Sequence, residues 1–148
     1  SVNNSNIKID KNGINAGNKN ITNVAEGTNA TDAVNVSQLN KVKSSIINNT
    51  QAISNNTKAI NNLNKKVNDV DRKSRAGIAG VAAIASAPSA RKDGKSMIST
   101  GVAHHRGESA IAIKASRNSD NGHWSSNVNG AADTRGQWTV GAGVGYEW

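Results

Sequence analysis

The chain has 148 residues, a formal net charge of +8, three Trp, one Tyr, no Phe and no Cys. Small and polar residues supply too little apolar area for a large core, so the strictly patterned apolar residues predict a core completed by other copies. The lack of Cys excludes disulfides and thiolate metal sites and suits a chain exported through an oxidising compartment. Scattered basic residues without an RNP, zinc or helix-turn-helix signature argue against nucleic-acid binding.

Residues 1–22 contain short β-like pieces separated by turn signals, and they predict a β-rich remnant of a head or connector. The pieces are Ile7–Ile9 and Ile21–Val24, the second of which runs past this segment. Because no signal peptide precedes Ser1, we expect the chain to be a fragment of a longer precursor. Asn35, followed three residues later by Gln38, predicts a capping arrangement that opens a helix.

Residues 39–75 carry an uninterrupted heptad pattern, which predicts a parallel coiled-coil stalk of roughly 55 Å at ~1.5 Å per residue. Asn, Ser and Lys dominate the other positions and form a solvated surface. The apolar seam consists of Leu39, Val42, Ile46, Ile53, Ile60, Leu63, Val67 and Val70.

Two seam positions hold asparagine, Asn49 and Asn56, each inside a repeat of the form Ile-x-x-Asn-Thr. A buried polar residue in a coiled-coil seam costs stability but fixes register and oligomer number. Three copies around a threefold axis would point their amide groups at one spot, where a chloride ion or a water would satisfy them. The pattern therefore favours a trimer with anion-binding layers, against the alternative that these asparagines are tolerated flaws.

Residues 76–90 predict a thin helix that continues the coil. The stretch from Ala76 to Ala87 is too short for a transmembrane helix, which needs about 20 residues. The seam nevertheless continues in phase through Gly77, Val81 and Ile84. Because Ala and Gly occupy nearly every side, we expect other parts of the protein to surround this helix closely.

Residues 91–148 predict four strands, and the last strand alternates between an apolar and a small or polar face. Its apolar face begins at Trp138 and ends at Tyr146 and Trp148, with aliphatic residues between. At ~40° tilt this strand would climb about 25 Å, which is the height of the apolar band of an outer-membrane barrel with two aromatic girdles. We place Trp124 in the same girdle as Tyr146 and Trp148.

Four strands cannot close a barrel, because the smallest barrels have about eight. Three chains give twelve strands and a lumen that admits three helices only if helices and inner wall are built from small residues. We therefore predict a membrane β-barrel plus coiled coil, with three lumenal helices continuing into the stalk. Lys114 shares the inward side of its strand, so it either pairs with an acidic group or marks a break in parity. Lumen packing is assigned to Gly77, Gly80, Gly141, Gly143 and Gly145.

The motifs resemble those of the trimeric autotransporter adhesins, the YadA-like outer-membrane proteins of Gram-negative bacteria. The matching pieces are the neck-like NVAEGTNATDAVNVSQL at 23–39, the Ile-x-x-Asn-Thr repeats, GKSM at 94–97, SDNG at 119–122 and the closing GAGVGYEW. The resemblance implies a neck at 23–38, a homotrimeric translocator that exports its own passenger, and an anchor that holds adhesive heads on the cell surface. It also implies contacts with outer-membrane lipid, a host ligand bound through a head outside this chain, and an aromatic signal at Tyr146 and Trp148 for the barrel-assembly machinery.

Other interpretations are weaker. Three histidines lie at strand ends without carboxylates at ligand spacing, and no nucleophile, base and orienting group can be matched, so we expect neither a metal site nor an enzyme. A soluble trimeric fibre, such as a phage tail fibre, is the alternative, but it leaves the aromatic-flanked strand unexplained. A cluster of cations before the lumenal helix is either a solvated face or a lipopolysaccharide contact: Lys65, Lys66, Arg72, Lys73 and Arg75.

Overall fold

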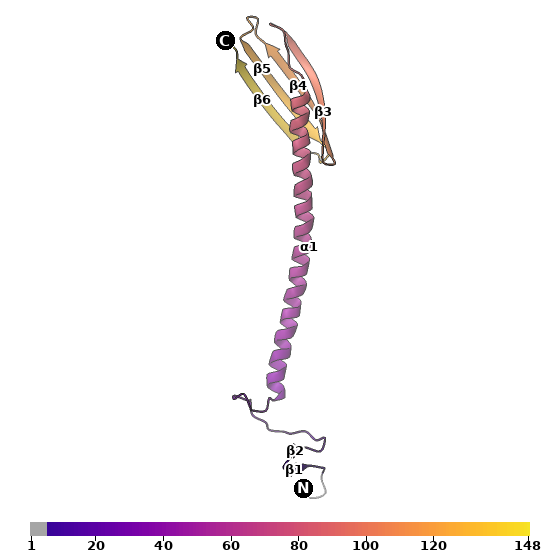
Figure 1. Cartoon of the computed structure of the whole chain (residues 1–148), viewed down its shortest axis with the longest axis vertical. Helices are drawn as coiled ribbons and strands as arrows, with labels where there is room; N and C mark the ends of the chain where they lie inside the picture. Colours follow the sequence, from indigo (N-terminus) through magenta and orange to yellow (C-terminus); the bar gives the residue numbers. More distant parts are fainter. Residues whose placement is uncertain (1–5) are drawn as a thin grey trace. The chain divides into compact units, whose positions relative to one another are not determined.

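The computed structural model describes residues 6–148 and divides into two compact units, one ending at Lys58 and the other beginning at Ala59. The first unit holds a short hairpin and the start of the long helix α1, and the second holds the end of α1 and a four-stranded sheet (Figure 1). The elements are β1 (Lys8–Asp10), β2 (Gly13–Asn15), α1 (Val36–Ser86), β3 (Ser96–His105), β4 (Glu108–Asn118), β5 (Trp124–Asp133) and β6 (Trp138–Tyr146).

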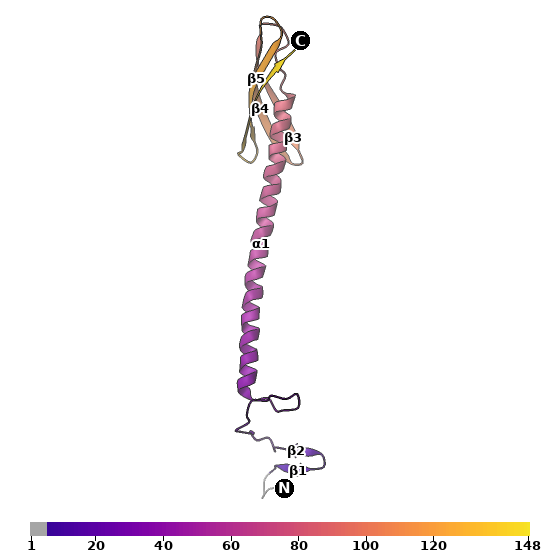
Figure 2. The ribbon, with the colours of Figure 1, turned by 90° about the vertical axis from the view of Figure 1, so that its left-hand side faces the viewer.

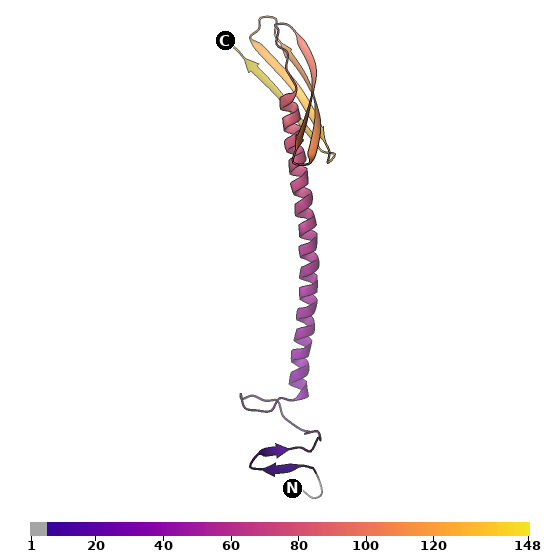
Figure 3. The same ribbon diagram turned by 45° about the vertical axis from the view of Figure 1, so that its right-hand side comes forward.

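The N-terminal hairpin (Figure 3) pairs β1 with β2 in antiparallel register around a tight turn at Lys11 and Asn12. The Asp10 carboxylate accepts the backbone N–H of Asn12 at 2.7 Å, and Gly13 has φ +117°, which favours glycine. The expected strand at Ile21–Val24 is wrong, because the chain forms no ladder there. Instead the carbonyl of Val24 accepts the Asn35 side-chain amide at 3.1 Å, so this backbone is held by the helix cap.

The start of α1 confirms the predicted cap. The side-chain oxygen of Asn35 accepts the N–H of Gln38 at 3.0 Å, and the side-chain oxygen of Gln38 accepts the N–H of Asn35 at 3.3 Å. The Gln38 amide also exchanges two hydrogen bonds with the backbone of Gly27, both at 3.0 Å. One side chain thus fastens the preceding loop to the first turn of the helix.

A carboxylate organises that loop. Asp32 accepts hydrogen bonds from the backbone N–H groups of Thr28 and Asn29 at 2.9 and 2.8 Å. The backbone N–H of Asn29, then that of Thr28, lowers the pKa of Asp32, because both bonds favour the charged carboxylate. The stability these bonds contribute is present above the ordinary pKa of an aspartate and is lost as pH falls through the lowered value.

The seam of α1 has no partner among residues 6–148. Every predicted seam residue from Leu39 to Val70 is more than half exposed, between 54% at Val70 and 65% at Ile53. The repeats also have a local function, since the hydroxyls of Thr50 and Thr57 donate to the carbonyls of Ile46 and Ile53, each at 2.9 Å. An apolar stripe of this length must be covered by other chains, as a coiled coil requires.

The sheet is an antiparallel meander in the order β3-β4-β5-β6, and it confirms the four predicted strands. Arg106 and Gly107 join β3 to β4 with φ of 47° and 89°, the left-handed conformation of a two-residue hairpin turn. The last turns of α1 lie against one face of this sheet, as two perpendicular views show (Figures 1 and 2). The other face carries no element of the second unit.

The helix ends at Ser86, four residues earlier than the predicted boundary at residue 90. Pro88 explains the difference, because a proline disfavours helical backbone in the residue before it. The released backbone is satisfied by side chains: Lys114 Nζ donates to the carbonyl of Ala87 at 2.7 Å, and Ser99 Oγ donates to the carbonyl of Pro88 at 2.6 Å.

Within residues 6–148 no helix combines the length and apolar content needed to cross a membrane.

The core between helix and sheet is built of alanine. The apolar interior that does exist is small because a thin helix approaches the sheet closely, as small residues permit. Its buried members are Ala79, Ala83, Ala110, Ala112 and Ala131.

Candidate functional site

The closest approach of strand to helix occurs at Gly101 in the middle of β3. A Cβ at this position would overlap the carbonyl oxygen of Ala83 and lie 2.6 Å from Ser86 Oγ. Gly101 is buried, whereas its neighbour Val102 on the opposite face is 71% exposed. The sequence analysis missed this residue, although a glycine inside a strand is itself a signal that another backbone comes near.

Two glycines of α1 lie on different sides of the helix. Gly80 faces the sheet, where an added Cβ would come within 3.7 Å of the Cβ atoms of Ala131 and Thr139. Gly77 has nothing within 4 Å of its Cβ position, and Val81 is 59% exposed, so both face away from the sheet of their own chain. The helix therefore has one face for its own sheet and a second that continues the stalk seam.

The glycines of β6 lie on the same face of the strand as Thr139, which contacts Gly80 of α1. The expected packing of Gly141, Gly143 and Gly145 against the lumenal helices concerns the assembled barrel and stays a prediction. Within the chain, however, their nearest atoms belong to residues directly opposite on β5. The missing side chains leave room for polar groups that lean across the strand, which are Asn129, Asn127 and Ser125.

Lys114 points inward, as its parity predicted, and it has no acidic partner among the described residues. Its ammonium group caps the carbonyl of Ala87 just beyond the helix end. A cation there also interacts favourably with the negative end of the helix dipole. The predicted break in parity is therefore wrong, and in the described part of the chain a backbone carbonyl takes the place of the acidic partner.

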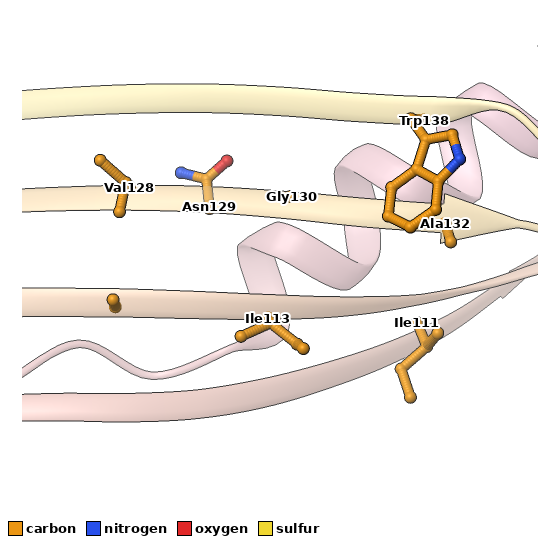
Figure 4. A pocket seen from close by; sticks show the side chains of 8 residues that line it. Ile111, Ile113, Val128, Asn129, Gly130, Ala132 and Trp138 are labelled. Carbon is orange, nitrogen blue, oxygen red and sulfur yellow. The ribbon is translucent and has the colours of Figure 1, made fainter.

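The outer face of the sheet is apolar and exposed. Ile98, Val140 and Val144 are each 74% exposed or more. Figure 4 shows Ile111, Ile113 and Trp138 on this face, with the helix behind the sheet. A sheet face in contact with water would carry polar residues at these positions, because a large apolar patch exposed to water promotes association.

Aromatic residues mark both ends of that face. Trp124 lies opposite Tyr146 in the β5–β6 ladder, with ring centroids 4.9 Å apart, which confirms their predicted proximity. Trp138 lies at the far end of β6, opposite Ala132, and is 79% exposed. Trp148 lies beyond the end of β6 and is 98% exposed. Aliphatic residues between two aromatic belts are typical of a lipid-facing barrel wall.

A buried carboxylate lies at the opposite end of the sheet from the helix terminus. Glu108, the first residue of β4, is 3% exposed and accepts hydrogen bonds from Arg72 Nε at 3.1 Å and Arg135 Nε at 2.9 Å. Thr134 Oγ1 adds a bond at 2.6 Å. Sequence reasoning missed this cluster, because its members are 36 and 27 residues apart and come together only through the hairpins.

The basic cluster before the lumenal helix is largely neutralised inside the chain. Lys73 pairs with Asp69 at 2.8 Å, Arg75 pairs with Asp71, and Arg72 pairs with Glu108. Among the described residues, Lys65 and Lys66 have no carboxylate at ion-pair distance. In the described part of the chain these two are thus the cations of the cluster without an ion pair, whereas Arg72 shares the single charge of Glu108 with Arg135.

Two of the three histidines have local side-chain hydrogen bonds. Nδ1 of His104 lies 2.8 Å from Ser109 Oγ, and Nδ1 of His123 lies 2.8 Å from the carbonyl oxygen of Glu147. Over residues 6–148 no three His, Cys, Asp or Glu side chains gather as metal ligands.

Comparison with known proteins decides which family uses this arrangement. Residues 88–148 match the YadA-like membrane anchor domain, and residues 20–62 match the coiled stalk of trimeric autotransporter adhesins. The chain belongs to the trimeric autotransporter adhesins. Autotransporter adhesin NhhA of Neisseria meningitidis is 34% identical over 96% of this chain, and EhaG of Escherichia coli O157:H7 is 33% identical over 100%. The chain spans 22% and 9% of the lengths of these relatives.

The family gives the unpartnered surfaces their partners. In a trimeric adhesin the seam of α1 meets two further copies as a coiled coil, and the unpaired edges of β3 and β6 meet adjoining sheets. Each adhesin chain contributes four strands to the barrel and one helix to its lumen. The matches favour this assembly and give no support to the soluble-fibre alternative.

Replacing Gly101 with Ala should weaken the adhesin trimer, because the new methyl group would overlap the helix backbone. Overpacking of this kind costs about 1–3 kcal/mol per chain. The temperature at which the trimer dissociates on a denaturing gel should fall. Gly130→Ala is the matched control, since its nearest atoms lie 3.7 and 3.8 Å from the new Cβ and the same change should be tolerated. Equal dissociation temperatures for both variants would contradict the close approach.

Proposed function

We propose that this chain is the outer-membrane translocator and anchor of a Gram-negative adhesin, with the stalk on the cell surface. The observation that carries the proposal is the two-faced sheet. Its outer face presents aliphatic residues between aromatic ends, and its inner face admits only a helix of alanine and glycine. Such a wall fits lipid outside and three thin helices inside, and its role is that of a membrane anchor and not of an enzyme.

The same lumen supplies a route for export. The assembled barrel holds three helices in its lumen. Before the helices occupy it, the same lumen would have room for the segments attached to their N-terminal ends to pass through. The chain would in this way mediate the export of its own passenger, while heads outside this chain bind the host ligand. Tyr146 and Trp148, exposed at the end of the last strand, are our candidates for recognition by the barrel-assembly machinery.

The first test is the mass of the assembly. Purified in detergent and loaded without boiling, the protein should run as a trimer of 15.4 kDa chains, and boiling should convert it to the monomer. Removal of detergent should precipitate it, because the outer face would then contact water. A detergent-independent soluble trimer would contradict the proposed anchor while leaving the coiled coil intact.

A contact with lipopolysaccharide is the second part of the proposal. It rests on Lys65 and Lys66, the two cations of the cluster that form no ion pair among the described residues. Each cation near an anionic membrane surface contributes on the order of 1 kcal/mol. Replacing both with Gln should therefore lower trimer stability in lipopolysaccharide more than in neutral detergent. Lys73→Gln is the control, because its charge is already paired with Asp69. Equal losses in both media would leave only a solvated face.

The third part concerns the stalk asparagines. We propose that Asn49 and Asn56 each bind one chloride ion on the trimer axis. The hydroxyls of Thr50 and Thr57 already donate to helix carbonyls. The asparagine amides are then the side-chain donors that can bind an anion on the axis of the coil.

Crystals of the stalk grown in bromide should show anomalous peaks on the threefold axis at both levels. Replacing both asparagines with Ile should remove the peaks and raise the melting temperature, because buried polar groups would be replaced by apolar ones. Amides turned away from the axis, with no peak at either level, would mean that the asparagines are tolerated flaws.

A further inference from the structure

Three segments distant in the sequence meet at Glu108, at the end of the sheet where α1 passes the β3–β4 and β5–β6 turns. Arg72 comes from the helix, Arg135 and Thr134 come from the β5–β6 turn, and Glu108 begins β4. Arg135 contacts both carboxylate oxygens, through Nε at 2.9 Å and Nη2 at 2.5 Å. The carboxylate therefore remains held by the sheet even without the helix, and Arg72 is the part that connects the helix to it.

A second bond acts at the next helix residue. Gln137 Nε2 donates to the backbone carbonyl of Lys73 at 2.9 Å, and its backbone N–H donates to Asp133 Oδ1 at 3.0 Å. Far along the helix, Lys114 bonds the carbonyl of Ala87. These directional contacts sit at both ends of the lumenal segment.

The helix segment between these two groups of hydrogen bonds contacts the sheet through apolar packing alone. In the part of the chain that the structure describes, residues 74–85 form no side-chain hydrogen bond or ion pair with the sheet. Their contacts run through Ala76, Ala79, Gly80 and Ala83, and through Ile84, which packs against the alanine core although the heptad pattern had placed it in the seam. Packing between small apolar residues is non-directional, and a shift of one helical turn brings Ala76 into the place of Gly80, which adds a single methyl group. A shift in the other direction brings Ile84 there, where Thr139 Oγ1 lies 3.2 Å from an added Cβ. Such a surface by itself does not define one axial position.

We propose that Glu108, Arg72 and Arg135 form a latch that sets the final axial position of the helix in the barrel. The proposal rests on the proposed export function, because a translocating chain needs a point at which movement stops. Three hydrogen bonds form together when the helix has this one axial placement. Arg72 donates to Glu108, Gln137 donates to the Lys73 carbonyl, and Lys114 donates to the Ala87 carbonyl. At any other position, Arg72 and the carbonyl of Lys73 would lose these partners, as register-specifying polar contacts in coiled coils do.

Disulfide trapping can measure this position, because the chain has no native Cys. The Cβ position of Gly80 lies 3.7 Å from the Cβ of Ala131, within the range of about 3.5–4.5 Å found in disulfides. The pair Gly80→Cys with Ala131→Cys therefore reports the observed register. Ala76→Cys and Ile84→Cys, each combined with Ala131→Cys, report shifts of four residues or ~6 Å in either direction.

The experiment uses the full chain in outer membranes, oxidised after assembly, with boiled gels to separate cross-links within a chain from those between chains. Without further changes, the in-register pair should dominate. Arg72→Gln should lower the ratio of in-register to out-of-register cross-links by about tenfold or more, and Glu108→Gln should do the same. Arg72→Lys, which keeps the charge, should restore part of the ratio.

Asp71→Asn is the matched control, because it breaks the exposed pair with Arg75 in the same turn of the helix and should leave the ratio unchanged. Arg72→Gln is the deciding variant, since Glu108 keeps Arg135 and Thr134 and the sheet end stays satisfied. An unchanged ratio in that variant would overturn the latch. A surface tag on the N-terminal end tests the export function separately: loss of display in the unlatched and latched chains alike would contradict that function, whereas normal display with an unchanged ratio would contradict the latch alone.

Discussion

The rest of the structure depends on the close packing of a thin helix against the inner face of a four-stranded sheet. At Gly101 no side chain fits between strand and helix, and the neighbouring contacts are made by alanine. This closeness explains why the chain has so little apolar core of its own. It also explains why the larger apolar residues of the sheet, such as Ile98 and Val140, lie on its outer face, while the seam residues of α1 are exposed as well. Both surfaces are left for other molecules: the seam for further copies, and the outer face, in the function proposed above, for lipid.

Small-residue packing leaves one property unspecified, which is where along its axis the helix stops. Polar side chains supply it. Lys114 holds the backbone where the helix ends, and Glu108 with its two arginines holds it where the helix enters. Alanine thus permits the helix to fit, and the charged groups at the two ends give that fit a single position. The two kinds of contact have different roles, because apolar packing contributes affinity without a preferred direction and hydrogen bonds require a defined geometry.

Several features could be predicted from single residues. The cap at Asn35 and Gln38, the four strands, and the faces of β4 and β6 follow from local chemistry and from a period of two along a strand. Two local predictions failed because a competing contact decided them. The backbone at Ile21–Val24 bonds to a helix cap and not to a strand, and Pro88 ends the helix before residue 90.

The sequence by itself determined the seam, the alternation of the strands and the need for other copies, since each is a periodic pattern that one element carries along its own length. Only the tertiary structure decided which groups meet across elements. Glu108 finds Arg72 and Arg135, Lys114 finds the carbonyl of Ala87, and Gly101 finds the backbone of Ala83. The physical reason is that these contacts depend on how far the helix lies along the sheet. No local propensity encodes that distance, because a helix of small residues packs almost equally well at several positions.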